Sequence, residues 1–291
     1  MRVTQSMLSN NMLRNLTSSY NKMGKLQEQL SSGKKVNRPS DDPVVVMKGM
    51  GYRMQVDKVA QYQKNLGEVN NWLDSSDDAL DNVGQALHRA KELVTNAANT
   101  GAMTPEDRDK IKIELKQLQE QIQDLANTKV GDKYIFSGTM TDKPLYDKVA
   151  KSFPADTTAF DKSIEIEVFD GVNLKVNTNA TALFEGIDEL FKVITAGDDD
   201  VDFGEAIKQI DTQLDAVLTS RADIGARSNR AELMHNRLEM QEGAAKKQQS
   251  ENEDIDYEKV ITDMLTQEAI HNAALSVGAR IIQPSLVDFL R

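Results

Sequence analysis

The stretch VAQYQKNLGEVNNWLDSSDDALDNVGQALHRAKELVTNA, from Val59 to Ala97, decides the fold of this chain. Its apolar residues recur at alternating spacings of three and four, interrupted only by Ser76: Val59, Tyr62, Leu66, Val69, Leu73, Ser76, Leu80, Val83, Leu87, Ala90, Val94 and Ala97. Such a repeat, kept over this length, is typical of a coiled coil. It predicts one long helix with a continuous buried stripe, either in a coiled coil or in an ordinary helix bundle.

The residues that follow predict a second helix that runs back along the first. Asn-Thr-Gly at 99–101 favours a helix end, Thr104 is a suitable N-cap, and Pro105 fits the first helical position. An apolar stripe then runs from Ile111 to Leu125. Because the connection is short, we expect the two helices to be antiparallel neighbours.

Amphipathic segments also lie at both ends of the chain. The first contains Leu13, Leu16, Tyr20, Met23, Leu26 and Leu30, a later one contains Ile207, Ile210, Leu214, Val217, Ile224, Ala231 and Leu238, and the last contains Ile255, Ile261, Leu265, Leu275, Ile281, Ile282, Leu286, Phe289 and Leu290. An isolated amphipathic helix is marginal in water and needs a partner for its apolar stripe. We therefore expect the chain to fold back so that the helices of its two ends pair.

Residues from Tyr134 to about Leu183 have a different pattern. Ile164, Ile166 and Val168 alternate with polar residues, and the Asp-Gly pair at 170–171 favours a hairpin turn. The predicted fold is mainly α with a small β-rich inserted domain: long antiparallel helices from both chain ends form a coiled-coil or bundle rod, with the β module at its tip. The expected domains are a terminal helical assembly domain of residues 1–42 plus 254–291, a helical rod of 43–133 plus 200–253, and a β-rich outer domain of 134–199.

Composition excludes several classes of function. The formal net charge is −11, which argues against binding to nucleic acid or to an anionic membrane. The chain has no Cys, so disulfides and thiolate metal sites are impossible, and its aromatic content of 5% suits long helices that each bury one stripe. The first residues lack the apolar segment of a signal peptide, which by ordinary rules predicts a cytosolic protein.

No pattern of catalytic or metal-binding residues is evident. His88, His235 and His271 lie on different predicted helices without an HExxH spacing. The run Asp198-Asp199-Asp200-Val201-Asp202 starts like a calcium-binding loop, but Phe203 stands where that loop requires Gly and Gln209 where it requires an acid. We expect no enzyme, no cofactor and no metal site.

The connector LSSGKKVNRPSDDP, residues 30–43, joins the first two predicted helices. Gly33 can end a helix in a left-handed conformation, the prolines stiffen the chain, and an aspartate can cap the next helix. We expect these residues to form a rigid elbow connector: Gly33, Arg38, Pro39, Asp41, Asp42 and Pro43. The order L-S-S-G, a basic and apolar pair, then D-D-P resembles the N-terminal signature of the bacterial flagellin superfamily.

The resemblance extends over most of the helical sequence. Residues 87–122, 221–233 and 254–291 are similar to helical segments of that superfamily. Within it, GDKYIFSGTMTDKPLY (131–146) and IIQPSLVDFLR (281–291) resemble the members that join the flagellar hook to the filament. A filament subunit is the alternative within the superfamily, and a cytosolic coiled-coil scaffold is the alternative outside it.

The resemblance implies a structural protein that is exported unfolded, without a cleaved signal, and acts outside the cell. It implies assembly through the terminal helices, and the residues expected at that interface are Leu13, Leu16, Leu30, Leu275, Leu286, Phe289 and Leu290. The implied partners are copies of the chain in a helical ring, a preceding hook-associated protein, flagellin and the filament cap on the distal side, and an export chaperone. Ligand binding by the β module, and innate-receptor recognition of residues 87–98, are left open.

Overall fold

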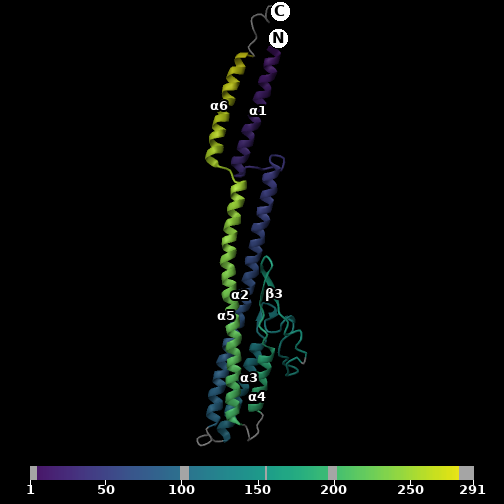
Figure 1. Cartoon of the computed structure of the whole chain (residues 1–291), viewed down its shortest axis with the longest axis vertical. Helices are drawn as coiled ribbons and strands as arrows, with labels where there is room; N and C mark the ends of the chain where they lie inside the picture. Colours follow the sequence, from purple (N-terminus) through teal and green to yellow (C-terminus); the bar gives the residue numbers. More distant parts are fainter. Residues whose placement is uncertain (1–4, 99–104, 155, 196–201, 282–291) are drawn as a thin grey trace, which may run out of the picture. The chain divides into compact units, whose positions relative to one another are not determined.

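A computed structural model describes residues 5–98, 105–154, 156–195 and 202–281 (Figure 1). The described residues form the helices α1 (Gln5–Ser32), α2 (Pro43–Ala98), α3 (Pro105–Ala126), α4 (Thr181–Thr195), α5 (Phe203–Glu253) and α6 (Tyr257–Ile281). Two antiparallel hairpins pair β1 (Lys129–Val130) with β2 (Lys133–Tyr134), and β3 (Glu165–Phe169) with β4 (Val172–Lys175). The predicted fold class, mainly α with a small β-rich insertion, is confirmed.

The chain divides into two compact units. The terminal unit comprises Met1–Lys58 and Glu242–Arg291, and the central unit comprises Val59–Gln241. Both α2 and α5 contribute residues to each unit. The three-domain division expected from the sequence stays a prediction.

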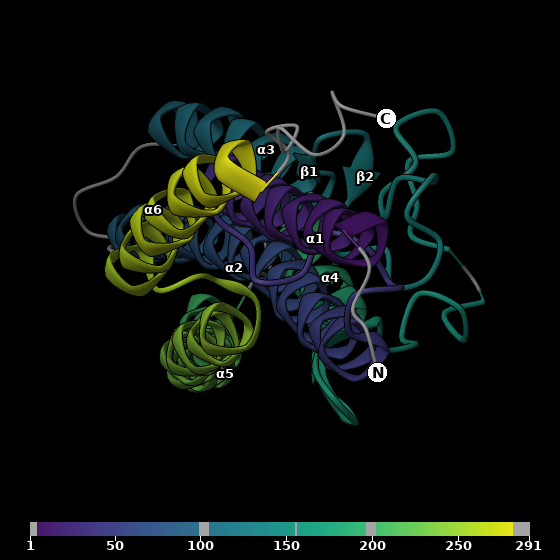
Figure 2. The same ribbon diagram turned by 90° about the horizontal axis from the view of Figure 1, so that it is seen from above.

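In the terminal unit, α1 and α6 lie side by side in both views (Figures 1 and 2). Gln267 Nε2 donates to Ser19 Oγ at 2.6 Å, and the rings of Tyr20 and His271 lie 6.2 Å apart. Met12, early in α1, lies beside Gly278, late in α6, and Gly33 at the end of α1 lies beside Tyr257 at the start of α6, so the helices are antiparallel. The predicted pairing of the chain ends is confirmed.

The row of α1 that faces α6 differs from the predicted stripe at two positions. The buried or half-buried row is Met12, Leu16, Ser19, Met23, Leu26 and Leu30. Leu13 and Tyr20 were expected on this row but are exposed. We call this row the inner row of α1. Its spacings alternate strictly between four and three, which keeps the row against a partner helix. This regular spacing places the polar Ser19 inside instead of Tyr20.

In the central unit, the long stripe of α2 is buried along its whole predicted length, from Val59 to Ala97. Its polar member, Ser76, donates its hydroxyl hydrogen to the carbonyl oxygen of Trp72 at 2.7 Å, so the group is satisfied within the helix. Arg89, nine residues before the end of α2, pairs at 2.8 Å with Glu114, nine residues after the start of α3, as expected if α3 runs back along α2.

The helix α5 also packs antiparallel on α2 in this unit. Lys91 pairs with Asp211, and Arg221 binds Asp77 at 2.8 Å and also Asp81. Arg221 interrupts the apolar stripe of α5, and these contacts explain the interruption, because its guanidinium bridges two carboxylates of α2. No helix in the described ranges is long and apolar enough to span a membrane.

The β3–β4 hairpin packs against α2 and α5 within the central unit (Figure 1). Asn65 Nδ2 donates to the Glu167 carbonyl oxygen at 2.8 Å, and Arg237 stacks over the ring of Phe169. The Phe169 ring also lies 6.2 Å from that of Tyr62. A hairpin of two short strands needs such a surface to bury its apolar face.

Candidate functional site

The elbow connector begins where Gly33 ends α1. Its N–H donates to the Gln29 carbonyl oxygen at 2.8 Å, and its φ of 69° is in the left-handed region that favours glycine. A β-carbon at this position would lie 2.8 Å from the hydroxyl of Tyr257. Glycine therefore serves both the helix end and the close approach of α6.

A tight turn follows in the middle of the connector. The N–H of Asp41 donates to the Arg38 carbonyl oxygen at 2.9 Å, and Pro39 occupies the second position of this turn, where its fixed φ is favourable. Two ion pairs tie the turn back to α1, Lys25 with Asp41 at 3.1 Å and Arg38 with Glu28 at 3.4 Å. Both pairs are exposed and each contributes little alone.

The connector ends in a capped helix start. Asp42 Oδ1 accepts hydrogen bonds from the backbone N–H groups of Val44 at 3.0 Å and Val45 at 3.1 Å. Pro43 is the first residue of α2, a position where its missing N–H has no consequence. The expected aspartate cap is confirmed for Asp42, whereas Asp41 pairs with Lys25.

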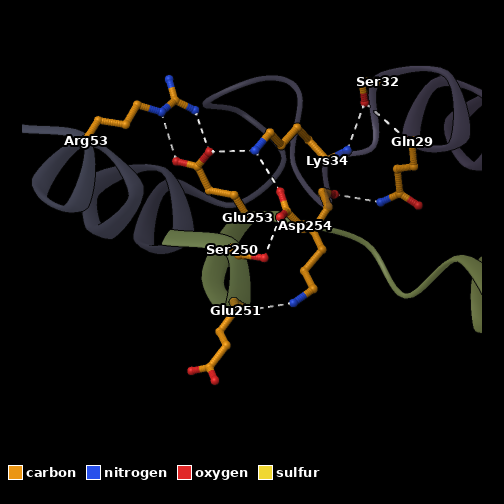
Figure 3. A network of polar contacts seen from close by, with 9 residues as sticks. Gln29, Ser32, Lys34, Arg53, Ser250, Glu251, Glu253 and Asp254 are labelled. Carbon is orange, nitrogen blue, oxygen red and sulfur yellow. Dashed lines mark hydrogen bonds and ion pairs between the residues drawn. The ribbon is translucent and has the colours of Figure 1, made fainter. Parts of the chain in front are cut away.

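A polar cluster joins this connector to the end of α5 (Figure 3). Arg53 donates to the buried carboxylate of Glu253 through two nitrogens, at 3.0 and 2.8 Å, and Lys34 Nζ lies 3.3 Å from the same carboxylate. Lys34 also binds Asp254 at 2.7 Å. We call these four residues, Lys34, Arg53, Glu253 and Asp254, the Glu253 clamp.

Backbone hydrogen bonds reinforce the Glu253 clamp. The N–H of Lys35 donates to the Glu253 carbonyl oxygen at 2.7 Å, and the N–H of Ile255 donates to the Gly33 carbonyl oxygen at 3.1 Å. Gln29 Nε2 binds the Lys35 carbonyl oxygen at 2.6 Å. The end of α1, the start of α2 and the end of α5 are thus held together by both backbone and side chains (Figure 3).

The charges of the clamp support each other. Burial alone would raise the pKa of the Glu253 carboxyl, but hydrogen bonds from Arg53 and Lys34 hold it below its usual value. The hydrogen bond to Asp254 raises the pKa of Lys34, and the same bond lowers that of Asp254. A β-carbon on Gly49 would lie 2.3 Å from the Glu253 carboxylate, so the glycine makes room for the clamp.

The residues expected at an assembly interface fall into three groups. Leu16 and Leu30 are half-buried on the inner row of α1. Leu13 and Leu275 are 54% and 47% exposed. Leu286, Phe289 and Leu290 lie outside the described residues.

Five exposed apolar residues of α1 and α6 share one side of the helix pair, whereas Ile270 and Val277 lie on the opposite side of α6. At about 100° per residue, Leu13 and Tyr20 lie to one side of the row that faces α6, and Ile261, Leu265 and Leu275 lie to the corresponding side of α6. Since the helices are antiparallel, these two sides coincide. We call these five residues the outer apolar face.

The row of α6 that faces α1 is only partly apolar. Its members are Val260, Met264, Gln267, His271, Ala274 and Gly278. Four of these six residues are small or polar, while Leu265, 58% exposed, points outward. Burial within one chain does not account for the exposed apolar residues of α6.

A second exposed apolar row lies on the first turns of α2. It contains Val44, Met47, Met50 and Met54, each more than half exposed. Methionine adapts its shape readily and is frequent on surfaces that bind other proteins. The terminal unit thus presents two apolar surfaces.

The three histidines do not form a site. His88 and His235 are exposed on α2 and α5 of the central unit, and His271 packs against Tyr20 in the terminal unit. Within the described ranges, no three His, Asp or Glu side chains group in a way that could hold a metal ion.

Comparison with known families identifies the architecture. The model of the bacterial flagellin N-terminal helical region matches residues 3–141, and that of the C-terminal helical region matches residues 207–290. Together the two matches cover most of the sequence. The chain belongs to the bacterial flagellin family.

Two curated relatives within the flagellin family align over nearly the whole length. Flagellar hook-associated protein 3 of Escherichia coli strain K12 is 24% identical over 298 residues, which cover 93% of each chain. Flagellin of Bacillus subtilis strain 168 is 26% identical over 301 residues, which cover 97% of each chain. A solved structure titled as a putative flagellar hook-associated protein from Vibrio parahaemolyticus has the same fold, with a TM-score of 0.64, 24% identity, and coverage of 74% of this chain and 100% of that chain.

Membership in the flagellin family makes this chain a structural component of the bacterial flagellum, an extracellular appendage built from polymers of such proteins. The predicted structural class is confirmed. Sequence reasoning identified the connector but missed Arg53 and Glu253, since only folding brings these two residues beside Lys34.

Proposed function

We propose that this chain is an adaptor at the hook–filament junction, which polymerises through α1 and α6. The observation that carries the proposal is the outer apolar face, on a chain that aligns over 93% of its length with a hook-associated protein 3. Exposed apolar side chains grouped on one side of a helix pair favour a protein–protein interface. The segments 131–146 and 281–291, which resemble junction members, favour this role over that of a filament subunit.

Burial of the outer apolar face supplies the driving force for assembly. Each large apolar side chain that moves from half exposure to burial contributes about 1 kcal/mol. Leu13, Leu265 and Leu275 would all gain this contribution against a neighbouring copy. Association then stabilises the α1–α6 pair by an amount that rises with the logarithm of the subunit concentration.

The elbow connector and the Glu253 clamp give every copy the same geometry. A helical assembly requires α1 and α6 to leave the start of α2 and the end of α5 in one fixed direction. Gly33, the Pro39 turn and the Asp42 cap restrict the backbone of the connector, and Glu253 ties it to α5. This supports the rigid-elbow role of Gly33, Arg38, Pro39, Asp41, Asp42 and Pro43.

The neighbours follow from an adaptor's position. One end of a ring of copies meets the preceding hook-associated protein, and the other receives flagellin and the filament cap. Before assembly, an export chaperone covers the outer apolar face, because a free subunit would otherwise expose it to water.

A filament flagellin is the second candidate, favoured by the 26% identity to the Bacillus subtilis protein over 97% of both chains. Immunogold labelling of isolated flagella with an antibody to residues 146–179 distinguishes the two. We expect a narrow band between hook and filament. Labelling along the whole filament would show a flagellin, and absence of label from flagella would reject both functions.

A further inference from the structure

The central unit contains a cavity of about 460 Å³ bordered by α3, the end of α4 and the loop that follows β2. This volume is in the range of small-ligand sites. Its wall is held in place by Asp188 of α4, which accepts hydrogen bonds from Gln119 at 2.8 Å and Gln123 at 2.7 Å on α3. The cavity uses no residue of the outer apolar face or of the Glu253 clamp, and we call it the Tyr146 pocket.

Tyr146 is built into the wall of this pocket. The side-chain amide of Asn127 binds both the N–H and the carbonyl oxygen of Tyr146, each at 2.9 Å, and the Tyr146 ring packs edge-on against Phe153 at 5.1 Å. Tyr146 is only 5% exposed, yet it lines the cavity, and no described residue forms a hydrogen bond with its hydroxyl. Burial, followed by the nearby charge of Asp188, raises the pKa of Tyr146, so the group stays a protonated donor.

Four lysines border the pocket, against the two carboxylates of Glu120 and Asp124. Lys148 pairs with Asp124 at 2.6 Å, and Lys192 pairs with the buried Asp188 at 2.7 Å.

The other two lysines, Lys116 and Lys151, have no ion-pair partner in the described part of the chain. Lys151 also has a left-handed backbone with a φ of 52°, a conformation that is unfavourable for a residue with a side chain and concentrates at functional sites. These two ammonium groups are free to bind a ligand.

We propose that the Tyr146 pocket binds a small organic anion, whose phosphate or carboxylate group is held by Lys116, Lys151 and the Tyr146 hydroxyl. All three groups are hydrogen-bond donors, and charge-assisted hydrogen bonds to an oxyanion are the strongest that such groups make. The pocket is a local concentration of positive charge on a chain whose net charge is −11. The volume beyond the anionic group accommodates a sugar-sized body.

Isothermal titration calorimetry on the full-length chain tests the proposal with four probes. Glucose 6-phosphate and glucuronate present the two anionic groups on the same type of ring, glucose is the neutral control, and inorganic phosphate is the bare anion. We expect saturable binding of at least one anionic sugar, weaker at high salt, and no binding of glucose. The stronger of the two anionic sugars identifies the preferred group, and equal binding of inorganic phosphate would show that the sugar body is not recognised.

Substitutions locate the binding in the pocket. The double variant Lys116→Gln/Lys151→Gln should weaken binding by about tenfold or more, and Tyr146→Phe, which keeps the ring packing, by a few-fold. The matched control Lys110→Gln/Lys112→Gln removes the same charge from α3 outside the pocket and should leave the affinity within about twofold. The proposal is overturned if neither anionic sugar binds, if glucose binds as well as its phosphate, or if the control pair loses as much affinity as the pocket pair. Circular dichroism confirms that each variant is folded.

Discussion

In the central unit, α2 buries its whole stripe, and most of these side chains are inaccessible to water. In the terminal unit, the inner row of α1 is only partly buried, and most of the large apolar residues of α6 point outward. Both regions are built from long antiparallel helices with heptad spacing. The difference teaches that one unit completes its core within the chain, whereas the terminal unit leaves apolar surface exposed, which we propose other subunits cover.

The largest expected effect on folding comes from a substitution that creates a cavity in the core of the central unit. Leu80 is fully buried, so Leu80→Ala should lower the free energy of unfolding by about 3 kcal/mol and the melting temperature by roughly 6–12 °C. Leu16→Ala, on the half-buried inner row of α1, is the matched substitution and should lower it by about 1 kcal/mol or less. Thermal unfolding followed by circular dichroism measures both. Equal losses would break the comparison, because the terminal unit would then have a completed core of its own.

The Glu253 clamp should give an intermediate, local and pH-dependent effect. The carboxyl pKa of Glu253 is lowered below 4.5 in the folded chain, so its stabilising contribution is present above about pH 4.5 and is lost as the pH falls through the folded pKa. Lys34 is raised above 10.5, so its contribution is present below that pH and is lost as the pH rises through the folded value. We expect the clamp to be most stable between about pH 5 and 10.

Hydrogen exchange of the Lys35 and Ile255 amides measures this, because both bond across the clamp. Glu253→Gln should speed their exchange at neutral pH, because it lowers the free energy of local opening by about 1–2 kcal/mol, a value reduced by the exposure of Arg53 and Lys34. It should also make the exchange rates less dependent on pH in the acid range. Arg89→Gln, which breaks an exposed pair with Glu114, is the control and should leave both amides unchanged. Unchanged exchange in Glu253→Gln would show that the Glu253 clamp does not hold the connector to α5.

The smallest effect on folding should come from the outer apolar face. Leu265→Asp should change the free energy of unfolding of the monomer by less than about 0.5 kcal/mol, because the side chain is already exposed. The same substitution should abolish polymerisation, measured by sedimentation of assembled protein and by swimming of cells that carry the variant. Leu218→Asp, an equally exposed leucine on α5 of the central unit, is the matched control. Normal assembly of Leu265→Asp would show that the outer apolar face is not an interface.

Local sequence signals predicted much of the connector. Proline in the turn, Asp42 before Pro43 and glycine at the end of α1 each act through the backbone of their own neighbourhood, so their effects can be read without the fold. The Glu253 clamp could not be predicted this way. Glu253 lies 200 positions from Arg53 in the sequence, and its polar surroundings carry no periodic signal that points to a distant partner.

The sequence by itself determined the helices, their antiparallel order and the stripe of α2, because apolar spacing near 3.5 defines a helix that must bury one side. Only the tertiary structure decided which residues of α1 and α6 face each other, since Leu13 and Tyr20 match helical spacing almost as well as Met12 and Ser19 do. It also decided that the β3–β4 hairpin packs against α2 and α5, because Phe169 finds its partners, Tyr62 and Arg237, on those helices. Periodicity defines which side of a helix is apolar, but the partner that covers that side depends on contacts between residues far apart in the chain.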